Sequence, residues 1–164
     1  MMYIKKFRTN LGNKMRFENY LTELAIKKGT TITPPKYKEE SMYEQDIILE
    51  DGLKFKFICY FFRTAGIWEV AFEDEQEVRA KETKRQGAAI ELFAALEKVF
   101  KTFIDKALPN EFHFSADLEE KSRVKLYDIL TKKILKAGYG YELYERKKSS
   151  VAIIYKFRHR SYKG

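Results

Sequence analysis

Two helical segments separated by a single strand constrain the fold more than any other feature of this sequence. Apolar residues recur at three- and four-residue spacing through 88–108, the pattern of a helix with one buried face. The run EFHFSA at 111–116 favours a strand, and a second helical stripe follows from Val124 to Ile134. Strand candidates lie before, between and after these helices, so we expect a mixed sheet with helices packed against it.

The middle and the end of the chain have the pattern of strands. Residues 43–63 contain two extended runs on either side of Asp51 and Gly52, a pair typical of a tight turn between antiparallel strands. IWEVAFE at 67–73 indicates a third strand, and residues 139–158 indicate a terminal hairpin. These segments supply the strands of one sheet.

The N-terminal part predicts a short strand at 2–8, an amphipathic helix at 13–28 and a polar connector at 30–41. No internal repeat, low-complexity tract or interdomain linker interrupts the chain. We therefore predict a single α+β domain over residues 1–164, with a mixed central sheet and helices on both of its faces.

The charge balance favours anionic partners. The formal net charge is +8 and the isoelectric point about 9.4, which suits a nucleic acid, a phosphorylated cofactor or an acidic protein surface. A solvated lysine-rich surface is the alternative interpretation. The basic residues that could meet nucleic acid or protein are Lys121, Arg123, Lys125, Lys132, Lys133 and the tail 155–164.

Cysteine and histidine are too few to suggest a metal site or a disulfide. Cys59 is the one cysteine, and His113 and His159 are far apart in sequence, so no zinc-ligand spacing occurs. No long uncharged apolar segment predicts a signal peptide or a membrane span. We expect a cytoplasmic protein with no metal and no membrane partner.

The segment KRQGAA, residues 84–89, precedes the body of the first helix. Small residues let backbone N–H groups approach a pyrophosphate, although Gly-Ala-Ala also begins many close-packed helices. With the order of strands and helices, this segment resembles the glycine-rich turn of the GNAT superfamily of N-acetyltransferases, Arg/Gln-x-x-Gly-x-Gly/Ala. The resemblance implies acetyl-coenzyme A as cofactor. The resemblance predicts that this cofactor is bound by Lys84, Arg85, Gln86, Gly87, Ala88 and Ala89. Lys84 stands where Arg or Gln is usual in the family.

A second part of the resemblance is SRVKLYDIL, residues 122–130, within the matching stretch 111–145. It is similar to the GNAT helix that presents a tyrosine to the departing thiolate of coenzyme A, which implies that Tyr127 is a general acid. A phenol with a pKa near ~10 can give up a proton at neutral pH. Glu120 and Arg123 depart from the family's Asn and Ala, and packing alone is the alternative role for Tyr127.

The resemblance also implies a base for the amine. Glu69 on the 67–73 strand is the first candidate by family analogy, and alternation points it away from Trp68 and Val70. A surface charge is the alternative interpretation. His113 is a second candidate base, and a structural role is the alternative interpretation for this histidine.

A narrower resemblance covers WEVAF, KRQGAAIELF and FHFSADLEEKSRVKLYDIL, which are similar to uncharacterised GNAT-like proteins of tailed bacteriophages. It implies a viral origin and a host-cytoplasmic location. The first predicted function is a degenerate, non-catalytic module that binds a host or virion protein or nucleic acid. The alternative is an acetyl-coenzyme A-dependent N-acetyltransferase using Tyr127, for which the fourth and fifth strands should part to admit pantetheine. The oligomeric state stays open, including self-association through an exposed strand edge.

Overall fold

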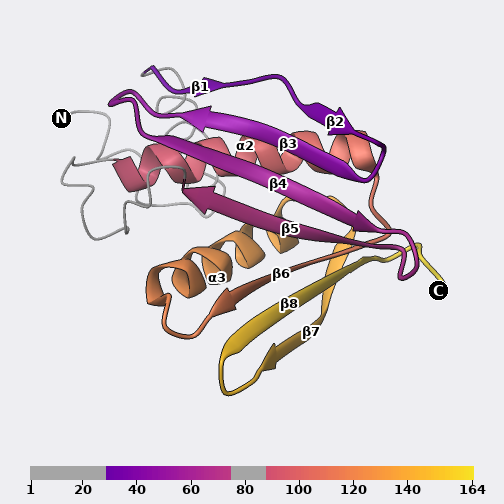
Figure 1. Cartoon of the computed structure of the whole chain (residues 1–164). Helices are drawn as coiled ribbons and strands as arrows, with labels where there is room; N and C mark the ends of the chain where they lie inside the picture. Colours follow the sequence, from indigo (N-terminus) through magenta and orange to yellow (C-terminus); the bar gives the residue numbers. More distant parts are fainter. Residues whose placement is uncertain (1–28, 75–87) are drawn as a thin grey trace, which may run out of the picture.

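Turns at glycine separate several strands of this chain. The structure, a computed structural model, describes residues 29–74 and 88–164 (Figure 1). Gly52 and Gly66 both adopt a positive φ, of 86° and 67°, a conformation that glycine reaches without strain. The elements are β1 (Thr31–Ile32), β2 (Lys36–Lys38), β3 (Met42–Ile48), β4 (Lys54–Phe62), β5 (Ile67–Asp74), α2 (Ala88–Ala107), β6 (Glu111–Asp117), α3 (Lys121–Lys136), β7 (Tyr141–Lys148) and β8 (Ala152–His159).

All described strands belong to one sheet in the order β1-β3-β4-β5-β6-β8-β7, with β2 also paired to β3. Every neighbouring pair is antiparallel except β5 and β6, which are parallel and connected through α2. The predicted α+β class with a mixed sheet is confirmed. The strand predicted at 2–8 and the helix predicted at 13–28 lie outside the described residues.

The predicted connector at 30–41 differs from the structure, which places two short strands there. β1 and β2 pair with β3 on either side of Pro34 and Pro35. Strands of two and three residues have no periodicity to detect, and proline is tolerated because this is the sheet's edge. The error therefore affects only the rim of the sheet.

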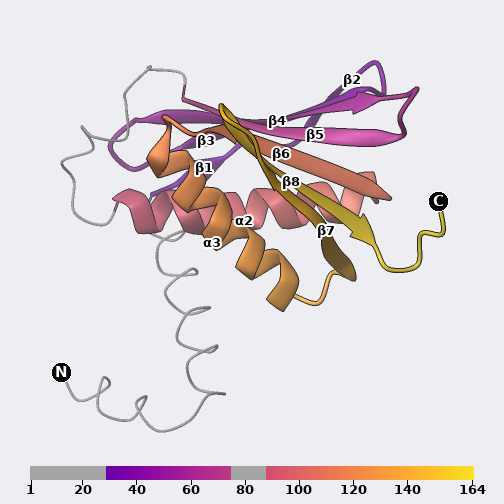
Figure 2. The same ribbon diagram turned by 90° about the horizontal axis from the view of Figure 1, so that it is seen from below.

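Both described helices cover the same face of the sheet (Figure 2). Phe112 and Phe114 of β6 point to that face, where Phe112 contacts Phe100 of α2 and Phe114 contacts Tyr127 of α3. An ion pair of 3.1 Å between Lys133 and Glu97 joins the helices. The described residues thus place helices on one face only, whereas the sequence predicts both.

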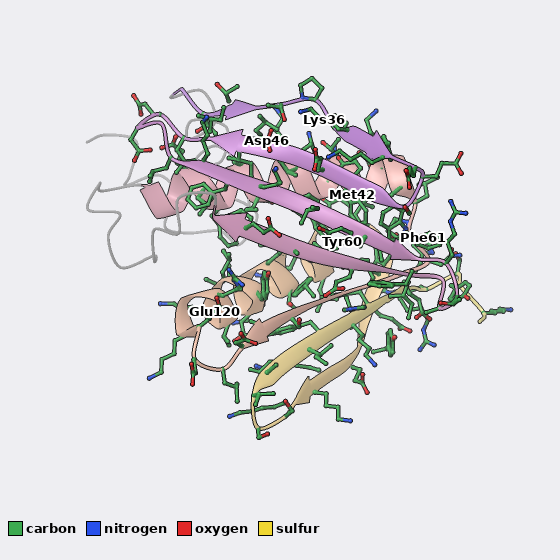
Figure 3. The ribbon with its side chains drawn as sticks, in the orientation of Figure 1. Lys36, Met42, Asp46, Tyr60, Phe61 and Glu120 are labelled. Atoms are coloured by element: carbon green, nitrogen blue, oxygen red, sulfur yellow. The ribbon has the colours of Figure 1, made fainter. Side chains whose placement is uncertain are left out.

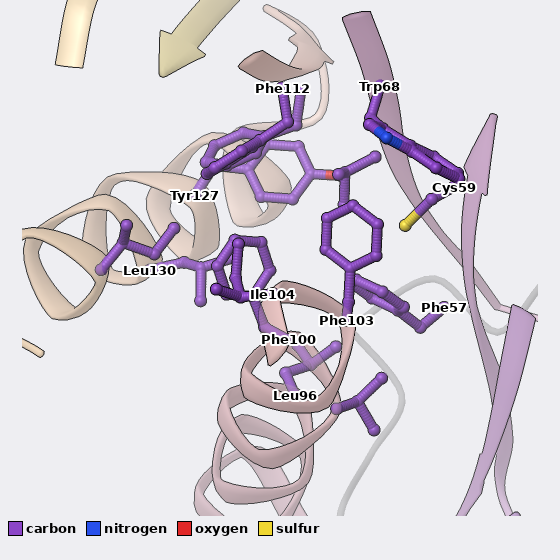
Figure 4. Close-up of a cluster of buried hydrophobic side chains, with 14 of the residues drawn as sticks. Phe57, Cys59, Trp68, Leu96, Phe100, Phe103, Ile104, Phe112, Tyr127 and Leu130 are labelled. Carbon is purple, nitrogen blue, oxygen red and sulfur yellow. The ribbon is translucent and has the colours of Figure 1, made fainter. Parts of the chain in front are cut away.

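Large aromatic rings fill the space between this face and the helices (Figure 4). The opposite face, called the outer face below, carries alternating residues such as Lys54, Lys56, Glu69 and Glu73. The largest fully buried side chains of the core are Tyr43, Tyr155, Phe57, Phe100, Phe103, Phe112, Phe114 and Phe157.

Among the described strands, β7 lies at one edge of the sheet and has features that oppose pairing with a second copy. The register of β7 against β8 shifts between Leu143 and Glu145, and charged side chains occupy much of the strand. Bulges and charges of this kind oppose edge-to-edge association. Self-association through this hairpin therefore has no support from the shape of the edge.

Candidate functional site

β5 and β6 pair at one end and separate toward the other. Their parallel pairing covers only three positions, from Ile67 to Glu69 of β5. Beyond them, β5 stays paired with β4 as far as Asp74, and β6 stays paired with β8 as far as Asp117. The sheet is therefore split in its middle while both flanks remain continuous (Figure 1).

A cavity of about 260 Å³ occupies this split. Alternation along β5 directs Glu69 and Glu73 to the outer face and Val70 to the helix side, so the cavity spans the sheet from one face to the other. Glu120 marks its helix side at the start of α3 (Figure 3). The lining residues are Glu69, Val70, Ala71, Phe72, Glu73, Ser115, Asp117, Glu120, Arg123 and Tyr127.

Tyr127 both packs in the core and lines the cavity. Its residue surface is 4% exposed, and its ring lies 4.7 Å from that of Phe114 and 6.3 Å from that of Tyr155. Burial raises the pKa of Tyr127 to about 12; Arg123 opposes this rise and Glu120 adds to it. The phenol is therefore protonated at neutral pH, and no described residue accepts its proton in a hydrogen bond.

Glu69 lines the cavity at the last paired position of β5, where the strands begin to part. Its partner across the parallel pair is His113, which does not line the cavity. Burial lowers the pKa of His113, Glu69 opposes that shift, and Lys156 adds to it. Glu69 and Tyr127 thus meet at one cavity, whereas His113 lies beside it.

The two departures from the family pattern also lie in the cavity wall. Arg123 donates across one helical turn to Glu120, with 3.0 Å between Nη1 and Oε2. Both side chains are partly exposed, so the pair contributes little to stability. Its main effect is to cancel one negative charge on the helix side of the cavity.

Sequence reasoning missed Glu73, Ser115 and Asp117 as lining residues. Strand alternation predicts that Glu73 shares a face with Glu69, and that Ser115 and Asp117 share a face of β6. The point at which β5 and β6 part depends on contacts between distant segments. These three residues therefore become site candidates only in three dimensions.

The predicted cofactor segment is only partly described. Lys84, Arg85, Gln86 and Gly87 lie outside the described residues, and α2 begins with Ala88 and Ala89. Their predicted role in binding phosphate stays a prediction.

Metal-binding clusters and membrane-spanning helices are absent from the described residues. They contain no group of three or more His, Cys, Asp or Glu side chains arranged to hold a metal ion. No helix among them has the length and apolar character needed to cross a membrane. Cys59 is fully buried, and burial raises the pKa of its thiol well above the ordinary value.

No family model and no curated protein matches this sequence. Among solved structures, a probable acetyltransferase resembles the chain with a TM-score of 0.48 at 11% identity, over 74% of this chain and 64% of its own. Ribosomal-protein-S5-alanine acetyltransferase from Vibrio fischeri gives 0.48 at 8% identity, over 93% and 75%. A ribosomal L7/L12 α-N-protein acetyltransferase in complex with coenzyme A gives 0.45 at 8%, over 93% and 75%.

The likeness is one of fold. This chain spans less than two thirds of the length of the first of these proteins. At such identities and scores, the resemblance carries no information on activity.

Proposed function

We propose that this chain is an acyl-coenzyme A-dependent N-acyltransferase whose acyl donor lies in the split between β5 and β6. The observation that carries the proposal is Tyr127. Its ring is almost fully buried, yet the residue lines the cavity and its hydroxyl has no hydrogen-bond partner among the described residues. The hydroxyl is not one of the fully buried unpaired polar atoms of the described residues, so it faces the open space of the cavity, where a bound molecule can reach it.

The split suits the pantetheine arm of an acyl donor. Within the described residues, no strand pairs with positions 70–73 of β5 on the side of the split. Backbone N–H and C=O groups need hydrogen-bond partners. The amide groups of an extended pantetheine would meet that need, while phosphate binding by residues 84–89 rests on the sequence resemblance.

The outer opening of the cavity favours a positively charged amine as acceptor. Glu69, Glu73 and Asp117 lie on that side of the split, and Arg123 balances only Glu120. Carboxylates lining a concave site raise the local concentration of cations. An amine that binds there reaches Glu69 before it reaches Tyr127.

The two predicted catalytic residues then divide the proton transfers. The donor, when bound, would supply a thioester. The carbonyl carbon of the thioester forms a C–N bond with the amine as its C–S bond breaks. The ammonium group of the acceptor first loses one proton to water, because only the neutral amine has the lone pair that attacks. Glu69 then takes a second proton from the attacking nitrogen, directly or through one water. Tyr127 holds a proton on its hydroxyl for the departing sulfur. The products are an amide and the free thiol.

The first test is calorimetric titration with acetyl-coenzyme A, followed by release of free thiol with a panel of polyamines and lysine peptides. We expect Glu69→Gln to lower kcat/KM about 100-fold, the loss typical of a missing general base. Glu142→Gln, on the exposed strand β7, removes the same charge away from the cavity and is the control. No binding of acetyl-coenzyme A at millimolar concentration would remove the proposal.

The non-catalytic binding module stays a second proposal. Its support is the Glu120–Arg123 pair, which occupies the cavity wall where the GNAT pattern has Asn and Ala. Acetyl-coenzyme A that binds without turnover of any amine would favour it. The viral origin and the cytoplasmic location stay predictions from the sequence.

A further inference from the structure

A second hollow lies along α3, among side chains that take no part in the cavity between β5 and β6. Its volume is about 270 Å³. It is shallow and open to solvent, and it is bordered by the β6–α3 connection, the first two turns of α3 and the β7–β8 hairpin. We call it the basic groove. Its lining residues are Leu118, Lys121, Val124, Lys125, Asp128, Lys148 and Ile153.

Three lysines give the groove a positive potential. Lys121 and Lys125 lie one turn apart on α3, and Lys148 ends β7. Among the described residues, none of the three has an ion-pair partner. The charge of the groove's single carboxylate, Asp128, is offset in part, since its Oδ1 accepts hydrogen bonds from the Tyr155 hydroxyl and from Arg146.

The position of Lys121 is unfavourable for the helix itself. It is the first residue of α3, and the first turn has no acidic side chain. Positive charge at a helix N-terminus is destabilising because it faces the positive end of the helix dipole. Lys121 therefore adds to the potential of the groove at a cost to local stability.

The floor of the groove is apolar. Ile153 is 4% exposed and belongs to the core cluster, against which Leu118 and Val124 pack. No aromatic ring lines the groove, whereas surfaces that bind single-stranded nucleic acid usually stack bases on such rings. The chemistry fits carboxylates around an apolar side chain better than it fits bases.

We propose that the basic groove binds an acidic segment of a partner protein, with an apolar side chain on the floor and carboxylates on the three lysines. Charge complementarity identifies this occupant. The proposal is independent of acyl transfer, because its residues do not line the cavity between β5 and β6.

The test uses the full chain and a fluorescein-labelled peptide of six aspartates around a central leucine. We expect binding that weakens with added salt. The triple variant Lys121→Gln, Lys125→Gln, Lys148→Gln should weaken it about tenfold, as the loss of three exposed ion pairs would. A peptide with serine in place of leucine should bind several-fold more weakly, since it leaves the apolar floor uncovered.

A matched control removes three exposed lysines of α2, Lys98, Lys101 and Lys106, in the same way. This variant should bind the peptide like the wild type, and unchanged thermal midpoints would show that both variants fold. Absent peptide binding, equal loss in both variants or indifference to the leucine would overturn the proposal. So would tighter binding of single-stranded oligothymidylate through the same lysines, which would assign the groove to nucleic acid.

Discussion

Removing one oxygen from Tyr127 separates its two roles, packing and catalysis. Tyr127→Phe keeps the ring, and with it the contacts to Phe114 and Tyr155. The hydroxyl has no hydrogen-bond partner among the described residues, so its removal breaks no hydrogen bond between them. We expect the free energy of unfolding to stay within about 1 kcal/mol of the wild type.

The effect on acyl transfer should be far larger. A positioned general acid contributes about 100-fold or more, which corresponds to roughly 3 kcal/mol of transition-state stabilisation. We therefore expect kcat to fall by about that factor between pH 7 and 9. Because the pKa of Tyr127 is about 12, its deprotonation should not limit the wild-type rate in this range.

Tyr155→Phe is the matched control, because it removes the same atom from the neighbouring ring. The Tyr155 hydroxyl donates to Asp128 Oδ1 at 2.6 Å and does not line the cavity. Its loss should cost about 2 kcal/mol of stability and leave kcat unchanged, the reverse of the Tyr127 result. If kcat of the Tyr127 variant equals that of the wild type, Tyr127 is a packing residue and the mechanism is wrong.

Two further predictions concern stability. Burial raises the pKa of Tyr127 from 10.0 to about 12, so its contribution is complete below pH 10 and is lost as the pH rises toward 12, a change of about 3 kcal/mol. Urea unfolding at pH 9 and 11 should show a fall that is smaller in Tyr127→Phe, and an equal fall in both proteins would contradict this origin. Asp128→Ala should lower stability by about 2 kcal/mol by removing the acceptor of the Tyr155 hydroxyl and the ion-pair partner of Arg146, whereas Asp128→Asn keeps an acceptor and should lose less. Equal losses in thermal denaturation would show that charge, not the hydrogen bond, matters at this position.

Local patterns predicted the central fold well because the physics there is local. The turns at Gly52 and Gly66 need a positive φ, and alternating side chains made β4 and β5 visible. β1 and β2 were missed because two or three residues carry no period. Packing of both described helices on one face depends on long-range contacts such as Phe100 with Phe112, which no local pattern encodes.

The candidate site shows the same division between local and long-range information. The resemblance predicted Tyr127 and Glu69, and the structure brings both to one cavity although they lie on different elements. Asp117 was not predicted, because its role depends on where β5 and β6 stop pairing. The bond from Tyr155 to Asp128 likewise joins residues 27 positions apart in the chain.

The two proposals place sites of opposite charge on one helix, α3. Arg123 and Tyr127, four residues apart, share the side of the helix at the cavity, while Lys121 and Lys125 share the side at the basic groove. The hydrogen bonds of Asp128, which also lines the groove, hold the helix to the hairpin. A cationic amine is attracted to the outer opening of the cavity and repelled by the groove, and an acidic segment experiences the reverse. Charge alone therefore keeps the two proposed ligands apart on a helix of sixteen residues.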